Sequence, residues 1–164
     1  MENDIQTVKI KKSNSLIRIG IKDEFDNDTG EYLQFDVDDM SSALQYQDCV
    51  EMHKKNLANF RNQIIIIEKK QDHKGKKLLS ANEEAELKAL NDFYAKEMEA
   101  LDLFIGKGKT KTILDIMGRK PYFSMFQDIV EMLEPVMPII EKGYKDFKNI
   151  IQNKYKEKEG NVLE

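Results

Sequence analysis

A heptad pattern of apolar residues constrains this chain more than any other feature of its sequence. Between residues 43 and 67 the apolar and aromatic positions, with one histidine among them, are spaced alternately by three and four residues. These positions are Ala43, Tyr46, Val50, His53, Leu57, Phe60, Ile64 and Ile67. Such spacing places them all on one face of an α-helix, as in a coiled coil. We therefore expect one long helix over 41–71, ended by the turn His73–Lys76.

A second helix of similar length is predicted to follow directly. Ser80 and Glu83 match the capping box of a helix start. One face of this helix then carries Leu87, Leu90, Tyr94, Met98 and Leu101. Because the link is short, the two helices should form an antiparallel αα-hairpin over 41–105. His53 is the polar residue of the seam, and we predict that it contacts Glu97 and fixes the register.

The N-terminal region has the period of β-strands. Isoleucines alternate with polar residues over 15–22, as do Leu33, Phe35 and Val37 over 31–37. The turn residues Asp26–Gly30 lie between these runs, so we expect a hairpin. Thr7–Lys11 offers a third strand that would make a meander. Since an isolated hairpin is marginal in water, its apolar face must rest on a helix or on a partner.

After the helical hairpin, glycines and prolines divide the chain into shorter helices. Gly106–Thr110 breaks the second helix, and a short helix Thr112–Met117 should end at Gly118. Pro121 is suited to the first turn of the next helix. That helix has a long seam, which continues through two further prolines and predicts one kinked helix or two coaxial ones. The seam consists of Phe123, Phe126, Val130, Leu133, Met137, Ile140, Tyr144, Phe147 and Ile151.

A second apolar stripe lies beside this seam and stops after residue 141. It consists of Met125, Ile129, Met132, Val136 and Ile139. A helix with two apolar faces is buried or is covered by a partner. Methionine is flexible and common on surfaces that accept varied partners. The stripe therefore predicts a partner-binding surface made of Met117, Phe123, Met125, Ile129, Met132, Val136 and Ile139. The alternative is that the chain itself covers both stripes.

Composition and charge exclude several classes of protein. The 26 basic and 30 acidic side chains give a net charge of −4, and residues 1–50 alone carry 5 basic and 11 acidic groups. This balance argues against nucleic-acid binding, which needs a basic surface. The longest apolar run, Ile64–Ile67, is too short to cross a membrane, and the N-terminus has no secretion signal. With one cysteine, the chain should be a cytoplasmic protein without disulfides.

No motif predicts a cofactor, a metal site or catalysis. Gly106–Thr110 resembles a phosphate loop, but it lacks the first glycine and follows a helix rather than a strand. Asp26–Gly30 has calcium-loop composition with the wrong spacing. Cys49 and His53 are four residues apart on one helix, without further ligands at a metal-binding spacing. Since no nucleophile has a base at a suggestive spacing, we expect no catalytic residue and no enzyme.

One segment resembles a known family. Within residues 98–142 an acidic helix end leads into a glycine, a short basic helix and then an amphipathic helix. The residues concerned are Leu101–Gly106, Ile116–Gly118, Phe123, Phe126, Ile129, Leu133, Pro135 and Ile139–Glu141. With the N-terminal hairpin, they make the chain similar to the tail assembly chaperones of long-tailed phages and of phage-tail-like particles of Gram-positive bacteria. The long hairpin over 41–104 departs from that pattern.

The resemblance implies a function without catalysis. Such chaperones bind the tape-measure protein, keep its apolar helices soluble and help the tail tube subunits polymerise in the host cytoplasm. Some are also made in a longer form by ribosomal frameshifting. The alternative function is a self-assembling structural subunit of a phage or phage-like particle, which would be a homo-oligomer.

The expected fold is therefore α+β and mostly α. An N-terminal β-hairpin region over 1–40 would precede the long antiparallel αα-hairpin over 41–105. A C-terminal helical region would follow over 106–157, and 158–164 would form a frayed polar tail. These parts could form one compact unit or two loosely coupled modules.

Overall fold

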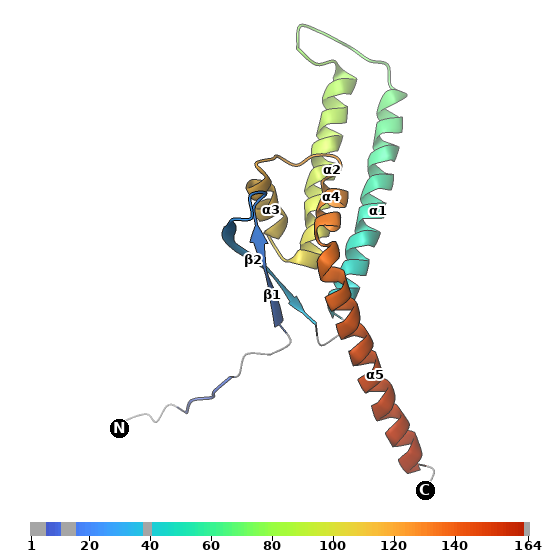
Figure 1. The fold of residues 1–164 in the computed structure, drawn as a ribbon. Helices are drawn as coiled ribbons and strands as arrows, with labels where there is room; N and C mark the ends of the chain where they lie inside the picture. Colours follow the sequence, from blue (N-terminus) through green and yellow to red (C-terminus); the bar gives the residue numbers. More distant parts are fainter. Residues whose placement is uncertain (1–5, 11–15, 38–40, 163–164) are drawn as a thin grey trace, which may run out of the picture.

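The fold is a β-hairpin and five α-helices, arranged as a mostly helical α+β protein (Figure 1). The computed structural model describes residues 6–10, 16–37 and 41–162. This architecture confirms the expected fold class. In chain order the elements are β1 (Leu16–Lys22), β2 (Asp28–Asp36), α1 (Ser41–Glu68), α2 (Ala81–Ile105), α3 (Lys109–Met117), α4 (Met125–Met132), the 3-10 helix η1 (Glu134–Val136) and α5 (Met137–Val162).

The two strands pair antiparallel, as the alternating pattern predicts. Ile17 lies opposite Phe35 and Ile19 opposite Leu33. β2 begins at Asp28, three residues before the expected start, because the turn is tighter than the run of turn residues suggested. The third strand is not formed over residues 6–10, where Val8 and Ile10 are exposed, and Lys11 lies outside the described residues.

The apolar face of the hairpin rests on the base of the αα-hairpin. Leu33 and Phe35 are buried. The ring of Phe35 lies 5.2 Å from that of Phe104 on α2, and Tyr46 of α1 packs edge-on against the same ring at 5.2 Å. The sheet is thereby covered by the protein's own helices, which supplies the packing that a two-stranded hairpin needs.

Helices α1 and α2 lie side by side and antiparallel, as expected (Figure 1). The capping box is present: Glu83 N donates to Ser80 Oγ at 3.1 Å, and Ser80 N donates to Glu83 Oε1 at 3.4 Å. α1 ends at Glu68 rather than at residue 71. In the loop between them, Asn82 N donates to Asp72 Oδ1 at 3.0 Å, which ties the loop to the start of α2.

The line of closest contact between α1 and α2 differs by one residue from the predicted seams. On α1 the buried positions are Ser42, Cys49 and Asn56, seven residues apart, together with Ile67 of the predicted seam. On α2 the buried line includes Ala89, Phe93, Glu97 and Ala100, whereas Leu87 of the predicted seam is 45 % exposed. Small side chains lie where two helix backbones approach most closely, and the larger apolar side chains flank that line.

A buried polar cluster joins three helices and confirms the predicted His53–Glu97 contact. His53 Nδ1 lies 2.5 Å from Glu97 Oε2, and Asn56 Nδ2 donates to Glu97 Oε1 at 2.9 Å. The His53 ring stacks on Phe126 of α4, with ring centroids 3.9 Å apart. Because Glu97 is fully buried, these hydrogen bonds replace the water that its carboxyl group loses on folding.

The C-terminal helices differ from prediction at their starts. α3 begins at Lys109, three residues early, and ends at Gly118, whose φ of +68° confirms it as the glycine after the helix. α4 begins at Met125 rather than at Pro121. Tyr122 is held instead by Asp128, whose Oδ2 accepts from its hydroxyl at 2.9 Å, and by Arg119, whose guanidinium lies 3.6 Å from its ring centroid.

α4 and α5 are two helices separated by η1. Two helices were one of the two arrangements expected from the sequence, the other being a single kinked helix. The break falls at Pro135, which lies at the first turn of η1. α5 then continues to Val162 and so includes residues 158–162 of the expected tail, while residues 163 and 164 lie outside the described residues. No helix within the described part of the chain is long and apolar enough to cross a membrane.

One apolar core connects all of these elements. It takes Leu33 and Phe35 from the sheet, and its remaining members come from α1 to α5 and from the residues that flank α4. These are Cys49, Ala100, Leu101, Phe104, Ile105, Ile113, Phe126, Ile129, Leu133, Val136 and Ile140. Both stripes of the 122–140 segment contribute to it, so the chain itself covers much of both faces.

A glycine on α5 allows that helix to approach the end of β2. A Cβ atom at Gly143 would lie 1.7 Å from the carbonyl oxygen of Val37. Glycine to alanine normally stabilises a helix interior by about 1 kcal/mol. We expect the opposite sign here: Gly143→Ala should lower the free energy of unfolding by about 1–3 kcal/mol in urea titrations, because the backbones must separate. Asn149→Ala, at an exposed position of α5, should be neutral or slightly stabilising.

Candidate partner-binding groove

Three of the seven residues predicted to bind a partner belong to the protein's own core. Met125 and Ile129 have no exposed surface, and Val136 is 6 % exposed. Ile129 and Val136 belong to the apolar core that also takes residues from β2, α1 and α2, so this part of the stripe packs inside the protein. In this respect the predicted surface requires correction, because these three side chains are unavailable to a partner in this conformation.

Two further residues of the predicted surface lie apart from each other. Phe123 belongs to an aromatic cluster, with ring centroids 6.0 Å from Phe60 of α1 and 5.5 Å from Phe93 of α2. Ile139 is exposed near the start of α5. Neither residue lines the groove described next.

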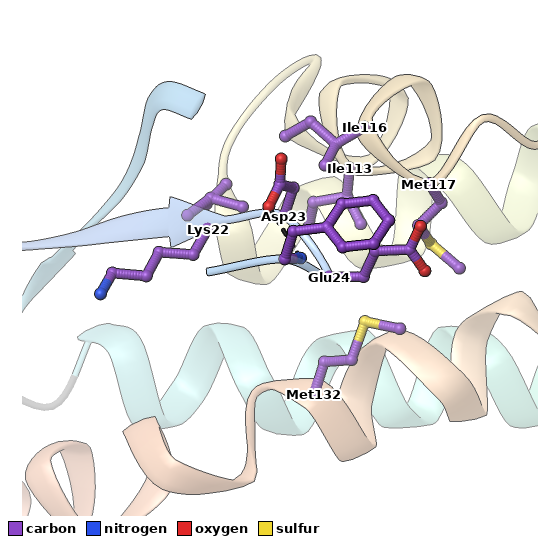
Figure 2. A pocket seen from close by; sticks show the side chains of 9 residues that line it. Lys22, Asp23, Glu24, Ile113, Ile116, Met117 and Met132 are labelled. Atoms are coloured by element: carbon purple, nitrogen blue, oxygen red, sulfur yellow. Dashed lines mark hydrogen bonds between the residues drawn. The ribbon is translucent and has the colours of Figure 1, made fainter. Parts of the chain in front are cut away.

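The remaining two residues, Met117 and Met132, line a common groove of about 550 Å³. We call it the methionine groove. It lies between the hairpin turn, α3 and the C-terminal end of α4. Figure 2 shows Met132 extending from α4 on one side, with Met117, Ile113 and Glu24 on the other side. The lining residues are Ile21, Lys22, Asp23, Glu24, Phe25, Ile113, Ile116, Met117 and Met132.

The α3 wall of the groove is positioned by Asp102, the last acidic residue of α2. Its Oδ2 accepts from Gly108 N at 2.9 Å, and its Oδ1 accepts from Thr110 N at 3.0 Å and from Thr110 Oγ1 at 2.6 Å. A carboxylate is favourable at a helix N-terminus because it accepts from the free amides there. Asp102 therefore fixes the start of α3, and through it the positions of Ile113 and Met117.

Removal of this cap should destabilise the protein. We expect Asp102→Ala to lower the free energy of unfolding by about 1–2 kcal/mol, because it leaves the fully buried Thr110 without its main acceptor. Urea denaturation followed by circular dichroism measures this loss. The matched control is Asp115→Ala, which removes an exposed carboxyl group from α3 and should change stability by less than about 0.5 kcal/mol. Equal losses for the two variants would contradict the capping role.

The hairpin-turn wall is held by the side chain of Asp23. Its Oδ1 accepts from Phe25 N and from Asn27 N, each at 2.9 Å. The hydrogen bonds from the Asn27 and Phe25 amides hold the pKa of Asp23 below its usual value, although partial burial opposes them. The turn thereby keeps a negative charge at the rim and presents Phe25, which is 76 % exposed.

The groove combines an apolar floor with a charged rim. Ile113, Ile116 and the two methionines supply the floor, while Lys22, Asp23 and Glu24 supply polar groups at the edge. Such a groove suits an apolar helical segment, since binding would remove exposed methionine and phenylalanine surface from water. Phe25 and Glu24 were missed from the sequence, where they fall between the expected strand over 15–22 and the expected turn residues Asp26–Gly30. An aromatic residue within an acidic turn was the available signal.

The motifs that resembled chemical sites have structural roles. The amides of Gly108 and Thr110, which a phosphate would need, already donate to Asp102. Burial, with the nearby Glu97, raises the pKa of Cys49 to about 12, so its thiol stays protonated at neutral pH. In the part of the chain that the structure describes, no three acidic, histidine or cysteine side chains gather as metal ligands would.

Comparisons with known proteins add no family assignment. No protein-family model matches the chain, and neither the curated proteins nor the solved structures gave a significant match.

Proposed function

We propose that this protein is a non-catalytic tail assembly chaperone of a phage or phage-like particle, and that its methionine groove holds an apolar helical segment of the tape-measure protein. The observation that carries the proposal is the groove itself, where Met132 is 55 % exposed beside Phe25 and Met117. The resemblance of residues 98–142 to that family supplies the identity of the partner.

The chemistry of the groove supports helix binding. A helix places side chains at intervals of three and four residues on one face, so a few apolar anchors would fill the floor along its length. Methionine adjusts its rotamers at little cost, which suits a partner that presents many similar apolar segments. The acidic rim favours basic residues at the flanks of the bound helix. In the assembly reaction, release of this helix would let tail tube subunits take its place.

The test is co-expression with the long helical product of the neighbouring gene. Phe25→Glu/Met132→Glu places two charges in the groove at positions that are already more than half exposed, so the variant should fold. We expect wild type to keep the partner soluble and to co-purify with it. The double variant should bind at least about tenfold more weakly, because the charges would have to be desolvated on binding.

A matched control separates the groove from apolar surface in general. Leu44→Glu/Ile65→Glu introduces the same charges at exposed apolar positions of α1 outside the groove. This variant should bind like wild type. Equal weakening by the two double variants would count against the groove as the site, and failure of wild type to bind any such partner would count against the chaperone function.

A second function is favoured by a different observation. α5 extends away from the rest of the protein (Figure 1). A projecting helix with apolar residues is a feature of self-assembling subunits, which is the alternative that the heptad pattern suggested. In that case the protein would form concentration-dependent oligomers and would not need a second gene product.

A further inference from the structure

The second half of α5 carries apolar residues beyond the point where the core ends. Ile140 is buried, but Tyr144, Phe147 and Ile151, which continue its spacing of four and three residues, are only half-buried. Ile150 is 53 % exposed. The main contacts of α5 are with η1 and α1, near the start of the helix. An apolar stripe therefore continues along a helix that projects from the protein.

This projecting segment is basic. Between residues 144 and 154 the sequence has 3 lysines and 1 acidic residue. Lys148 follows Tyr144 by four residues and precedes Ile151 by three, and Lys154 follows Ile151 by three. Residues at these spacings are neighbours on a helix surface. Lysines thus border the apolar stripe on α5.

The methionine groove has the complementary chemistry. Its floor is apolar, and its charged lining residues are Lys22, Asp23 and Glu24. Beyond the lining, residues 26–31 of the same hairpin turn add 3 acidic side chains and no basic one. The amide hydrogen bonds of Asn27 and Phe25 lower the pKa of Asp23, which favours the charged form of this carboxyl group. An apolar helix flanked by lysines matches both the floor and the rim.

The groove cannot be filled by α5 of the same chain. Gly143 lies against the carbonyl of Val37, just after the end of β2, whereas the groove adjoins the turn before β2. β2 has nine residues, which at about 3.3 Å per residue separates its two ends by roughly 30 Å. From Gly143 onward α5 runs away from the hairpin and α3 (Figure 1).

We propose that the α5 segment from Tyr144 to Lys154 of one copy occupies the methionine groove of a second copy. Pairing of α5 with α5 would bring two lysine-rich helices together, and such like-charge contacts are unfavourable. The proposal rests on the groove being the chaperone's binding site and describes how that site is regulated. Self-association covers the groove until the apolar helix of the client displaces α5.

Cysteine cross-linking between two copies tests this contact directly. The only native cysteine, Cys49, is fully buried, so introduced cysteines should react alone. Full-length Phe25→Cys and Ile150→Cys chains, with different tags, are mixed and oxidised mildly. We expect disulfides mainly between the two different variants. The control mixes Ile150→Cys with Ile65→Cys, whose cysteine is at an exposed position far along α1. This mixture should give no disulfide-linked pair.

Two outcomes would overturn the proposal. One is preferential cross-linking of Ile150→Cys with itself, which indicates α5 pairing with α5. The other is a yield with Phe25→Cys no higher than with Ile65→Cys, which indicates random collision.

Charge reversal gives a second, independent measurement. Lys148→Glu/Lys154→Glu should weaken self-association about tenfold in sedimentation equilibrium. A second copy that carries Glu24→Lys in its groove should restore the association with this variant. The control Lys142→Glu/Lys156→Glu makes the same change in net charge at exposed positions away from the stripe, and it should alter the dissociation constant by less than about twofold. Equal weakening by both variants would contradict a specific contact.

These measurements separate the proposal from the chaperone function. If the Lys148→Glu/Lys154→Glu variant is monomeric and binds the client more tightly than wild type, α5 competes for the groove. If the α5 contact forms but no client binds, the contact between the two copies stands, while the chaperone function fails and with it the displacement of α5 by a client. If the client binds in the groove without any α5 contact, only the proposal fails.

Discussion

Glu97→Ala should lower the free energy of unfolding by about 3–5 kcal/mol, a large share of the stability of a domain of this size. Glu97 is buried, and its two carboxyl oxygens hold His53 and Asn56 of α1. The alanine variant leaves the buried Asn56 amide and the partly buried His53 ring without their acceptor, and a buried polar group keeps its full desolvation cost. It also loosens the His53 ring, which stacks on Phe126 of α4.

Urea denaturation measures this effect, and two further variants calibrate it. Glu97→Gln keeps an oxygen that can accept from Asn56 and should lose less than the alanine variant. Glu99→Ala removes an exposed carboxyl group two residues along the same helix and should change stability by less than about 0.5 kcal/mol. If Glu97→Ala were as stable as Glu99→Ala, the polar cluster would not hold the three helices together.

Met125→Glu should prevent folding or cost at least about 4 kcal/mol, whereas Met132→Glu should cost less than about 0.5 kcal/mol. The two methionines lie on the same predicted stripe of α4. Met125 has no exposed surface, so a carboxyl group there would lose its water without a designed partner, while Met132 is 55 % exposed. Thermal unfolding of both variants, followed by circular dichroism, gives the comparison.

The result distinguishes core from surface within one stripe. Similar destabilisation by both substitutions would show that Met132 is core, and the groove would then have no apolar side chain to offer from α4. Similar tolerance would show that α4 is not covered by the chain as described. Either result would remove the structural basis of the binding proposal.

The features that local rules govern were predictable from the sequence. The capping box of Ser80 and Glu83, the end of α3 at Gly118 and the hairpin over Leu16–Asp36 all depend on residues close in sequence. The His53–Glu97 contact was also predictable, since the lengths of two antiparallel helices and their turn fix which residues lie opposite each other.

Features that depend on close packing were not predictable in the same way. The true contact line of α2 includes Ala89, Glu97 and Ala100, which a search for large apolar residues passes over. Pro121 could have started a helix, but Tyr122 is held by contacts with Arg119 and Asp128 that sequence periodicity does not reveal.

The candidate site was only partly predictable for a related reason. The sequence predicted a partner-binding surface that includes Met117 and Met132, and these two residues line the groove. It could not separate them from Met125 and Ile129, because the coverage of a stripe depends on elements that fold against it from elsewhere in the chain. Phe25 joins the groove from a turn about 90 residues earlier, a distance that no helical period spans.

The most direct test of client binding in the methionine groove uses the methionines as probes. Methyl groups of ¹³C-labelled methionine are assigned by single substitutions, and their signals are recorded with and without the apolar helical client. We expect the signals of Met117 and Met132 to shift when the client binds, while the signal of the fully buried Met125 does not. Shifts confined to methionines outside the groove, such as Met52 on α1 or Met98 on α2, would contradict it.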